Sequence, residues 1–446
     1  MIATTPVRKR LLGVLLLGGS LVACGGGDAA SEPTTTTTLA PATTLAPATT
    51  LAPATTLAPA TTTTVAPTTV PPLATAELEE RIRDALEAWR IETGVPGSSM
   101  TVSLPDRSEI TVTVGTRDLV TDEPVRADDY WRIASITKPI VSTVILQLVE
   151  QGLVELDAPV STYLGAGWAQ GYVLDGVDYG DLVTVSQVLD HSDGFKEYAF
   201  DPSFYLLVSD RLDVPMEPRE VVAWAVGQGP QYVPGTAYGY NTVGHVVAGL
   251  IIETVTGRPA EEVLREAVFE PAAAEDVYLT PREFPPVRVP AGYVQGVLRD
   301  ALGLIPGLAQ YVEQATVGDF FDVTAVPQAV LTSAPFTGGG LEAQLDDVAR
   351  IFRSMFDGTL LQPDSIDSFT TSALDTGYGL GIDVSEFEGS TVYSHGGGVP
   401  GFRSHALYIP DLDVALAMSA NLIPIDPDVG SVVDEVLGLV SAELGR

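Results

Sequence analysis

The sequence predicts an α/β protein in which both ends of the chain build one layered unit and the middle is inserted between them. Three observations support this fold class. An amphipathic helix and a β-hairpin precede the middle, strand-like runs and a helix close the chain, and the stretch between them is turn-rich and partly helical. We expect the α/β part to comprise residues 76–160 and 338–446, with a mostly helical insertion at residues 161–337.

The folded region is expected to begin near residue 76. Apolar side chains recur at helical spacing from Leu78 to Trp89 in a segment rich in Glu and Arg, which predicts a helix with one buried face. Apolar and polar residues then alternate over residues 100–104 and 110–114, on either side of a Pro-Asp-Arg-Ser turn. This pattern predicts a β-hairpin.

The C-terminal part reads as strands followed by a helix. Residues 392–394, 406–409 and 414–418 are short apolar runs typical of strands, and an apolar helical pattern starts at about Val429. These elements are the second half of the predicted α/β part.

The N-terminal part is expected to direct export and to contribute nothing to the core. Residues 1–23 have a basic start and a leucine-rich run too short to span a membrane, as in a secretory signal. Cys24 is the only cysteine, and the Leu-Val-Ala-Cys segment that it closes resembles the lipobox of bacterial lipoproteins. We expect Cys24 to be lipidated and to hold the protein at the outer face of the cell membrane; an incidental thiol past a cleavage site is the alternative.

Residues 24–75 are expected to form a disordered tether. They are rich in Thr, Pro and Ala and include four consecutive Leu-Ala-Pro-Ala-Thr-Thr repeats, whose spacing fits neither a helix nor a strand. The formal net charge of −35 makes nucleic acid an unsuitable partner and predicts repulsion from anionic membranes. The lipid, and not charge, is therefore expected to provide membrane attachment.

Ser135 and Lys138 are the strongest candidates for chemistry. An apolar run begins at residue 140, so both residues fall at a helix start, where side chains three positions apart share one face. A desolvated lysine can take the proton of a serine hydroxyl, whereas arginine cannot. After the leader, the chain has only two lysines, Lys138 and Lys196. A solvated Ser and Lys pair without catalytic role is the alternative.

The chain resembles the superfamily of serine β-lactamases and D-alanyl-D-alanine carboxypeptidases, in its class C-like branch. Ser-x-x-Lys is one mark of that superfamily. The similarity extends from about residue 76 to the C-terminus, through residues 131–164, 189–194, 234–240, 338–341, 377–381 and 395–401. The resemblance implies an antiparallel sheet flanked by helices, with the active site between the sheet and the inserted helical part.

The resemblance also assigns a tyrosine. The Tyr-x-Asn element of the superfamily falls on Tyr240-Asn241-Thr242, so Tyr240 would share proton transfer with Lys138. Thr242 replaces the asparagine that contacts the substrate amide, which leaves substrate preference open. Packing of Tyr240 as an ordinary loop aromatic is the alternative.

A third element, His-x-Gly on a strand beside the site, matches His395-Gly396-Gly397. By the resemblance, His395 and the following glycines would bind substrate, and the backbone N–H groups of Gly398 and Ser135 would form the oxyanion hole. Three further histidines are interpreted as structural: His191, His245 and His405.

These residues indicate a serine acyl-transfer hydrolase that forms an acyl-enzyme on Ser135. The sequence contains no Gly-x-Ser-x-Gly elbow or zinc-protease helix, and the resemblance implies no metal and no cofactor. A D-alanyl-D-alanine carboxypeptidase acting on cell-wall peptides is the first hypothesis, and a β-lactamase or a carboxylesterase is the alternative. The hypothesis from another class is a catalytically silent, wall-binding lipoprotein.

Overall fold

Strands from the two ends of the chain form one seven-stranded sheet in the computed structural model, which describes residues 74–445 except 200 and 306. The spatial order is β12-β13-β14-β15-β1-β2-β3, and every neighbouring pair is antiparallel. The strands are β1 (Gly97–Ser103), β2 (Glu109–Asp118), β3 (Glu123–Pro124), β12 (Asp383–Phe387), β13 (Ser390–Val399), β14 (Phe402–Ile409) and β15 (Val414–Ala420). The predicted N-terminal hairpin and the C-terminal strands are confirmed, and so is the predicted fold class.

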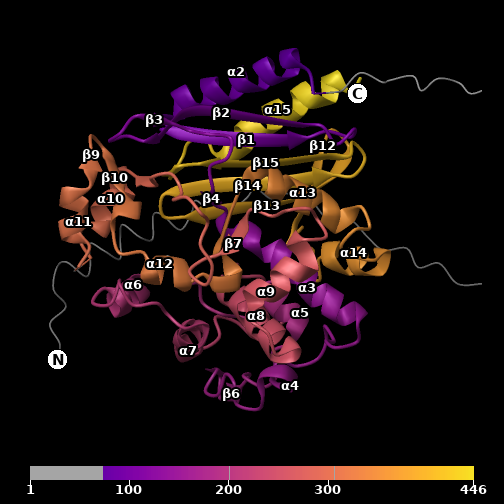
Figure 1. Ribbon diagram of the computed structural model, residues 1–446. Helices are drawn as coiled ribbons and strands as arrows, with labels where there is room; N and C mark the ends of the chain where they lie inside the picture. Colours follow the sequence, from indigo (N-terminus) through magenta and orange to yellow (C-terminus); the bar gives the residue numbers. More distant parts are fainter. Residues whose placement is uncertain (1–73, 200, 306, 446) are drawn as a thin grey trace, which may run out of the picture. The chain divides into compact units, whose positions relative to one another are not determined.

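Two terminal helices cover one face of this sheet (Figure 1), α2 (Ala76–Thr93) and α15 (Val429–Glu443). Helix α2 begins where the Thr75 side chain accepts a hydrogen bond from the Leu78 N–H at 3.1 Å. It ends at Gly94, whose φ of +70° suits glycine. Leu78 and Trp89 are buried on the predicted apolar face.

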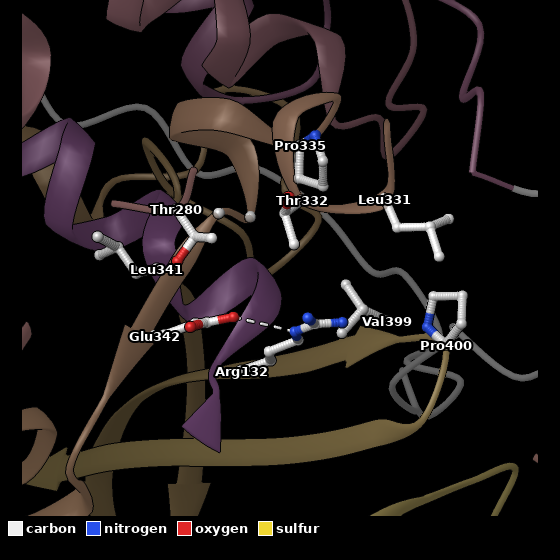
Figure 2. Close-up of a pocket in the computed structure, with 11 residues that line it drawn as sticks. Arg132, Thr280, Leu331, Thr332, Pro335, Leu341, Glu342, Val399 and Pro400 are labelled. Atoms are coloured by element: carbon white, nitrogen blue, oxygen red, sulfur yellow. Dashed lines mark hydrogen bonds and ion pairs between the residues drawn. The ribbon is translucent and has the colours of Figure 1, made fainter. Parts of the chain in front are cut away.

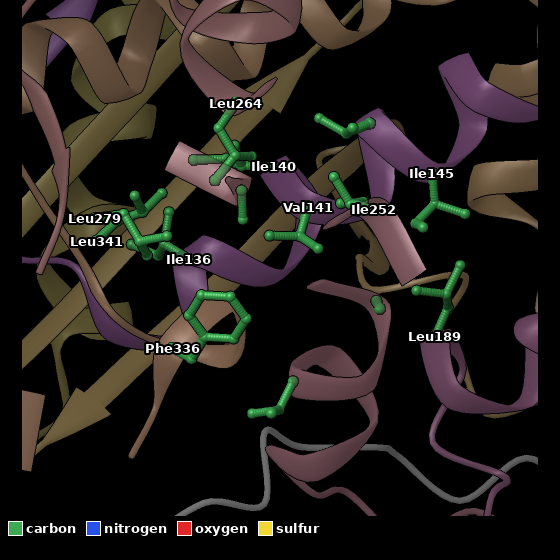
Figure 3. Close-up of a cluster of buried hydrophobic side chains, with 14 of the residues drawn as sticks. Ile136, Ile140, Val141, Ile145, Leu189, Ile252, Leu264, Leu279, Phe336 and Leu341 are labelled. Atoms are coloured by element: carbon green, nitrogen blue, oxygen red, sulfur yellow. The ribbon is translucent and has the colours of Figure 1, made fainter. Parts of the chain in front are cut away.

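Helices α13 (Leu345–Phe356), α3 (Thr137–Glu150) and α8 (Val243–Thr256) lie on the opposite side of the sheet (Figure 1). Helix α13 packs directly on β1, β14 and β15. Helix α3 is surrounded by apolar side chains from distant parts of the chain, such as Leu189, Ile252 and Phe336 (Figure 3). The helix that carries Lys138 is therefore held rigidly, which favours a fixed catalytic geometry.

The middle of the chain adds helices and several short strands. The helices are α4 (Ser161–Leu164), α5 (Val185–Leu189), α6 (Pro202–Val208), α7 (Pro218–Gln228), α9 (Ala260–Leu264), α10 (Gly296–Leu302), α11 (Ala309–Gln314) and α12 (Ala329–Ser333), and α14 (Pro363–Thr370) follows α13. The short strands are β5 (Val173–Leu174), β6 (Val177–Asp178), β7 (Val277–Leu279), β8 (Tyr293–Val294), β9 (Thr316–Val317) and β10 (Phe320–Asp322). These strands are too short to be predicted from alternation of apolar residues.

One small sheet positions the site. Strand β11 (Leu341–Ala343) pairs on one side with β7 and on the other with β4 (Trp131–Arg132), which immediately precedes the predicted nucleophile. The N–H of Ile133 continues the contact by donating to the Leu341 carbonyl at 3.1 Å. Segments more than 200 residues apart in the chain are thereby joined beside Ser135.

The predicted leader, residues 1–23, and almost all of the predicted tether, residues 24–75, lie outside the described residues. Within residues 74–445, apart from the two omitted positions, no helix has both the length and the apolar character needed to cross a membrane.

Candidate active site

Ser135 lies in a single 3₁₀ turn, η2 (Ala134–Ile136), that leads directly into α3. The Lys138 amine, in the first turn of α3, lies 3.0 Å from the Ser135 hydroxyl oxygen. Ala134 has a φ of +52°, a conformation that costs a residue with a side chain about 1–3 kcal/mol and is often found at functional sites. The bond from Thr137 Oγ1 to the Ala134 carbonyl, at 2.7 Å, holds this turn. The structure thus brings the predicted pair together.

Lys138 is completely buried, and its Nζ also donates to the Gly338 carbonyl at 2.7 Å. Burial lowers the pKa of Lys138 to about 7, although the negative charge of Glu197 acts in the opposite direction. Near neutral pH a large fraction of this amine is therefore uncharged. An uncharged amine next to a serine hydroxyl can serve as a general base.

Tyr240 lies on the loop before α8 with its ring 4.9 Å from Lys138 Nζ. Burial raises the pKa of Tyr240 well above its usual value, and a hydrogen bond with Ser135 opposes this only in part. Tyr240 is consequently protonated at neutral pH. It can pass a proton between the serine, the lysine and a leaving group, but Lys138 is the better acceptor of the first proton.

Thr242 occupies the position that the resemblance assigns to asparagine. It precedes α8, and its methyl carbon and carbonyl lie so close to Gly338 that a Cβ on that glycine would meet both at 2.6 Å. Asn241 instead points into the protein, where its amide bonds Asp193 at 2.9 Å. Thr242, and not Asn241, therefore borders the carbonyl that anchors Lys138.

Glu197 belongs to the site, although the sequence analysis did not single it out. Its two carboxylate oxygens accept backbone hydrogen bonds from Thr242 at 2.5 Å and from Ala199 at 2.7 Å. Glu197 follows Lys196 on an irregular loop, and no spacing of residues in the sequence predicts that it belongs to the site. Its proximity to Lys138 arises only from the tertiary fold.

Gly398, the predicted oxyanion donor, lies on strand β13. Strand β12 pairs with β13 only as far as Ser394, which leaves residues 395–399 without a neighbour on that side. On the other side, Val399 and Phe402 pair across a two-residue turn, where the closing pair normally exchanges both hydrogen bonds. The next residue, Gly398, is then a non-bonded position, so its N–H points to the open edge.

Gly397 lets β13 approach the nucleophile turn closely. A Cβ on Gly397 would lie 2.3 Å from the Ile133 carbonyl oxygen and 2.1 Å from Ser404 Oγ. Neighbouring Gly396 has more space, because the nearest atom to its Cβ would be Arg403 Nη1 at 3.3 Å. Of these two glycines, Gly397 is the one that close packing requires.

His395 is buried at the start of this open edge, in a chain of hydrogen bonds with defined directions. Its Nδ1 lies 2.6 Å from the Gly396 carbonyl oxygen, which can only accept, so Nδ1 carries the proton. Because burial keeps the ring neutral, its Nε2 accepts the hydrogen of Tyr378, 3.0 Å away. The Tyr378 oxygen in turn accepts from His191 Nε2 at 3.1 Å.

His395 is uncharged at neutral pH. Burial lowers the pKa of His395 to about 3, and the charge of Lys138 adds to the effect. His395 is therefore a neutral residue beside the open edge of β13, with both ring nitrogens engaged in hydrogen bonds.

The interpretation of the other histidines as purely structural is incomplete. The His191 ring lies 4.5 Å from the Tyr240 ring, and its pKa is held well below the usual value by burial. His245 is buried on α8, where its Nε2 lies 3.1 Å from Ser142 Oγ. Its ring lies 5.4 Å from the ring of His191. His405 is buried on β14, where it pairs with Gly396 of β13 and contributes to the lowered pKa of His395.

Cys24, the predicted lipidation residue, lies outside the described residues. In the described part of the chain, no three His, Cys, Asp or Glu side chains are grouped so that they could hold a metal ion.

Comparisons with known proteins show what this chain is similar to. A family model described as Beta-lactamase matches residues 75–431. Penicillin-binding protein 4 of Amycolatopsis lactamdurans is 28% identical over 358 residues, which cover 78% of this chain and 86% of that protein. Esterase EstB of Burkholderia gladioli is 30% identical over 167 residues, which cover 36% of this chain and 41% of the esterase.

Solved structures share the fold over most of its length. A D-stereospecific amidohydrolase from Streptomyces sp. superimposes with a TM-score of 0.65 at 27% sequence identity. The match covers 80% of this chain and 97% of the amidohydrolase.

Proposed function

The chain belongs to the beta-lactamase family of serine hydrolases, and on that premise we propose that it cleaves D-alanyl-D-alanine peptides of the cell wall through an acyl-enzyme on Ser135. One observation carries the proposal: a buried lysine with a pKa of about 7 lies 3.0 Å from the serine oxygen. A serine hydroxyl becomes an effective nucleophile when such a base can take its proton.

The acylation step follows from the positions of four groups. Ser135 Oγ attacks the substrate carbonyl carbon while its proton moves to Lys138 Nζ. The N–H groups of Ser135 and Gly398 stabilise the oxyanion that forms. As the C–N bond of the tetrahedral intermediate breaks, the proton passes from Lys138, with Tyr240 as intermediary, to the leaving amine. A water molecule, activated in the same way, then hydrolyses the ester and restores Ser135.

The choice of D-amino acid peptides is supported by the relatives. Penicillin-binding protein 4 is similar over most of its length, and the Streptomyces protein is named for D-stereospecific hydrolysis of amides. A tether on an exported protein would also allow it to reach cell-wall peptides.

The neutral state of His395 favours a second candidate. A peptide ending in D-alanine and a β-lactam both carry a carboxylate, which is bound best by a cation. His395 supplies no charge, because its Nε2 accepts from Tyr378 and its Nδ1 donates to Gly396. An ester or amide with an uncharged leaving group would not need a cation at this position. Similarity to Esterase EstB is in keeping with such a substrate.

Three substrates with the same N-acyl-D-alanyl group would separate the candidates. They are the N-acyl-D-Ala-D-Ala acid, its C-terminal amide, and the ethyl ester of N-acyl-D-alanine. A carboxypeptidase should have the highest kcat/KM for the acid, by about tenfold or more if a charge-assisted hydrogen bond reads the carboxylate. A higher kcat/KM for the ester or the C-terminal amide than for the acid would favour an esterase or amidase. The Ser135→Ala variant serves as the blank, and binding of all three without turnover by the wild type would reject both and support the silent binding protein.

We further propose that the protein is exported and held at the outer face of the membrane by lipidation of Cys24. The Leu-Val-Ala-Cys segment and the preceding apolar leader support this. The Cys24→Ala variant should leave the membrane fraction and appear in the soluble extract. Unchanged membrane association of that variant would contradict the lipid anchor.

A further inference from the structure

A recess with about 370 Å³ of free space, part of it open to solvent, lies beside the nucleophile turn (Figure 2). It touches the site at three places. Gly339 follows the carbonyl that anchors Lys138, Val399 follows the oxyanion donor Gly398, and Arg132 lies three residues before Ser135. A Cβ on Gly339 would lie 3.6 Å from the backbone carbon of Ala134, so the recess borders the nucleophile turn.

Its position relative to the proton donors identifies which part of a substrate it can hold. The leaving group must receive a proton, so it must lie next to Tyr240 and Lys138. Neither of these residues, nor His395, lines the recess. We therefore assign the recess to the acyl part of the substrate, which stays attached to Ser135 after the first step.

The recess has an apolar rim and a polar end. Leu331, Pro335, Val399 and Pro400 contribute apolar surface. At the other end, the Nε of Arg132 bonds the buried Glu342 carboxylate at 3.0 Å.

The other donors at this end are available to a ligand. Figure 2 shows the terminal nitrogens of Arg132 turned toward Val399, into the space between the walls. Thr280 adds a hydroxyl that is buried and has no hydrogen-bond partner among the described residues. A buried polar group without a partner is costly, and a ligand oxygen would satisfy it.

We propose that this recess is a subsite for the acyl part of the substrate, and that it selects acyl chains with an apolar body and a carbonyl or carboxylate oxygen that accepts hydrogen bonds from Arg132. The inference rests on the proposed acyl-enzyme function and adds its substrate class. Glu342 balances the charge of Arg132, so an uncharged amide carbonyl is suited to the subsite as well as a carboxylate. A peptidic acyl group provides such a carbonyl.

The test uses p-nitrophenyl esters of acetic acid and of three six-carbon acyl chains that end in a methyl group, a primary amide or a carboxylate. The wild type should prefer the amide- or carboxylate-ended chain over the methyl-ended chain by about tenfold in kcat/KM. Comparing the amide-ended with the carboxylate-ended chain shows whether Arg132 binds an uncharged carbonyl oxygen or a carboxylate oxygen better. The Arg132→Gln, Glu342→Gln double variant, which removes both charges together, should reduce this preference to within about twofold.

A second variant tests the space without altering charge. Leu331→Trp should fill the recess and lower kcat/KM for all six-carbon chains about tenfold relative to the acetyl ester of the same variant. Leu182→Trp, at an exposed position of the chain that does not line the recess, should leave that ratio unchanged. Equal use of methyl- and oxygen-ended chains by the wild type, or unaltered ratios in both recess variants, would overturn the subsite. Failure of the wild type to hydrolyse any ester faster than Ser135→Ala would instead reject the acyl-enzyme function.

Discussion

Replacing Lys138 with methionine should lower kcat/KM for any acyl substrate by about 10²- to 10⁴-fold, the range typical for loss of a general base. Methionine is close in length and apolar, so it fills the buried space without introducing a charge. What it loses is the lone pair 3.0 Å from Ser135 Oγ and the donor to the Gly338 carbonyl. Single-turnover acylation by a labelled penicillin or fluorophosphonate, followed by intact mass, measures the step directly.

The matched control is Lys196→Met, because Lys196 is the only other lysine after the leader. Its amine pairs with Asp201 on a loop and makes no contact with Ser135. This variant should acylate at close to the wild-type rate. Rapid acylation of Lys138→Met would show that another group removes the serine proton.

The pH dependence of the wild-type enzyme should follow the protonation of Lys138. Only the uncharged amine can accept a proton, so kcat/KM should fall about tenfold per pH unit below about 7 and level off above it. The negative charge of Glu197 raises the pKa of Lys138, so Glu197→Gln should move this limb to lower pH. In Lys138→Met the limb near pH 7 should disappear.

The parts of the site that could be predicted from sequence are local ones. Ser135 and Lys138 meet because three residues separate them at a helix start, and this geometry needs no information from the rest of the chain. The β-hairpin and the C-terminal strands are equally visible, since alternation of apolar residues sets their faces. The resemblance supplied the order of the three motifs, but not how their side chains would be protonated.

The parts that could not be predicted depend on distant contacts. Glu197 reaches the lysine because its carboxylate caps the backbone of Thr242, 45 residues away. The neutral state of His395 follows from its burial by distant segments of the chain, which lowers its pKa to about 3. A histidine before glycines can be a cation or a neutral residue, and its burial in the folded protein distinguishes these states.

Gly397→Ala should lower kcat/KM by at least about 100-fold. The new Cβ would lie 2.3 Å from the Ile133 carbonyl oxygen, which is backbone and cannot rotate away. Relief requires β13 to move from the nucleophile turn, and this displaces the N–H of Gly398 from the oxyanion. Loss of one oxyanion donor costs about 10²- to 10³-fold, and misplacement of reacting groups by about 1 Å can cost 10²-fold.

Comparison with Gly396→Ala separates this effect from a general intolerance of β13 to side chains. At position 396 the nearest atom to a Cβ is the end of the flexible Arg403 side chain, at 3.3 Å, so the loss should be much smaller. Thermal unfolding of both variants should accompany the kinetics, because overpacking alone destabilises by about 1–3 kcal/mol. A folded Gly397→Ala variant with nearly normal kcat/KM would mean that the oxyanion donor is not set by contact between β13 and Ile133.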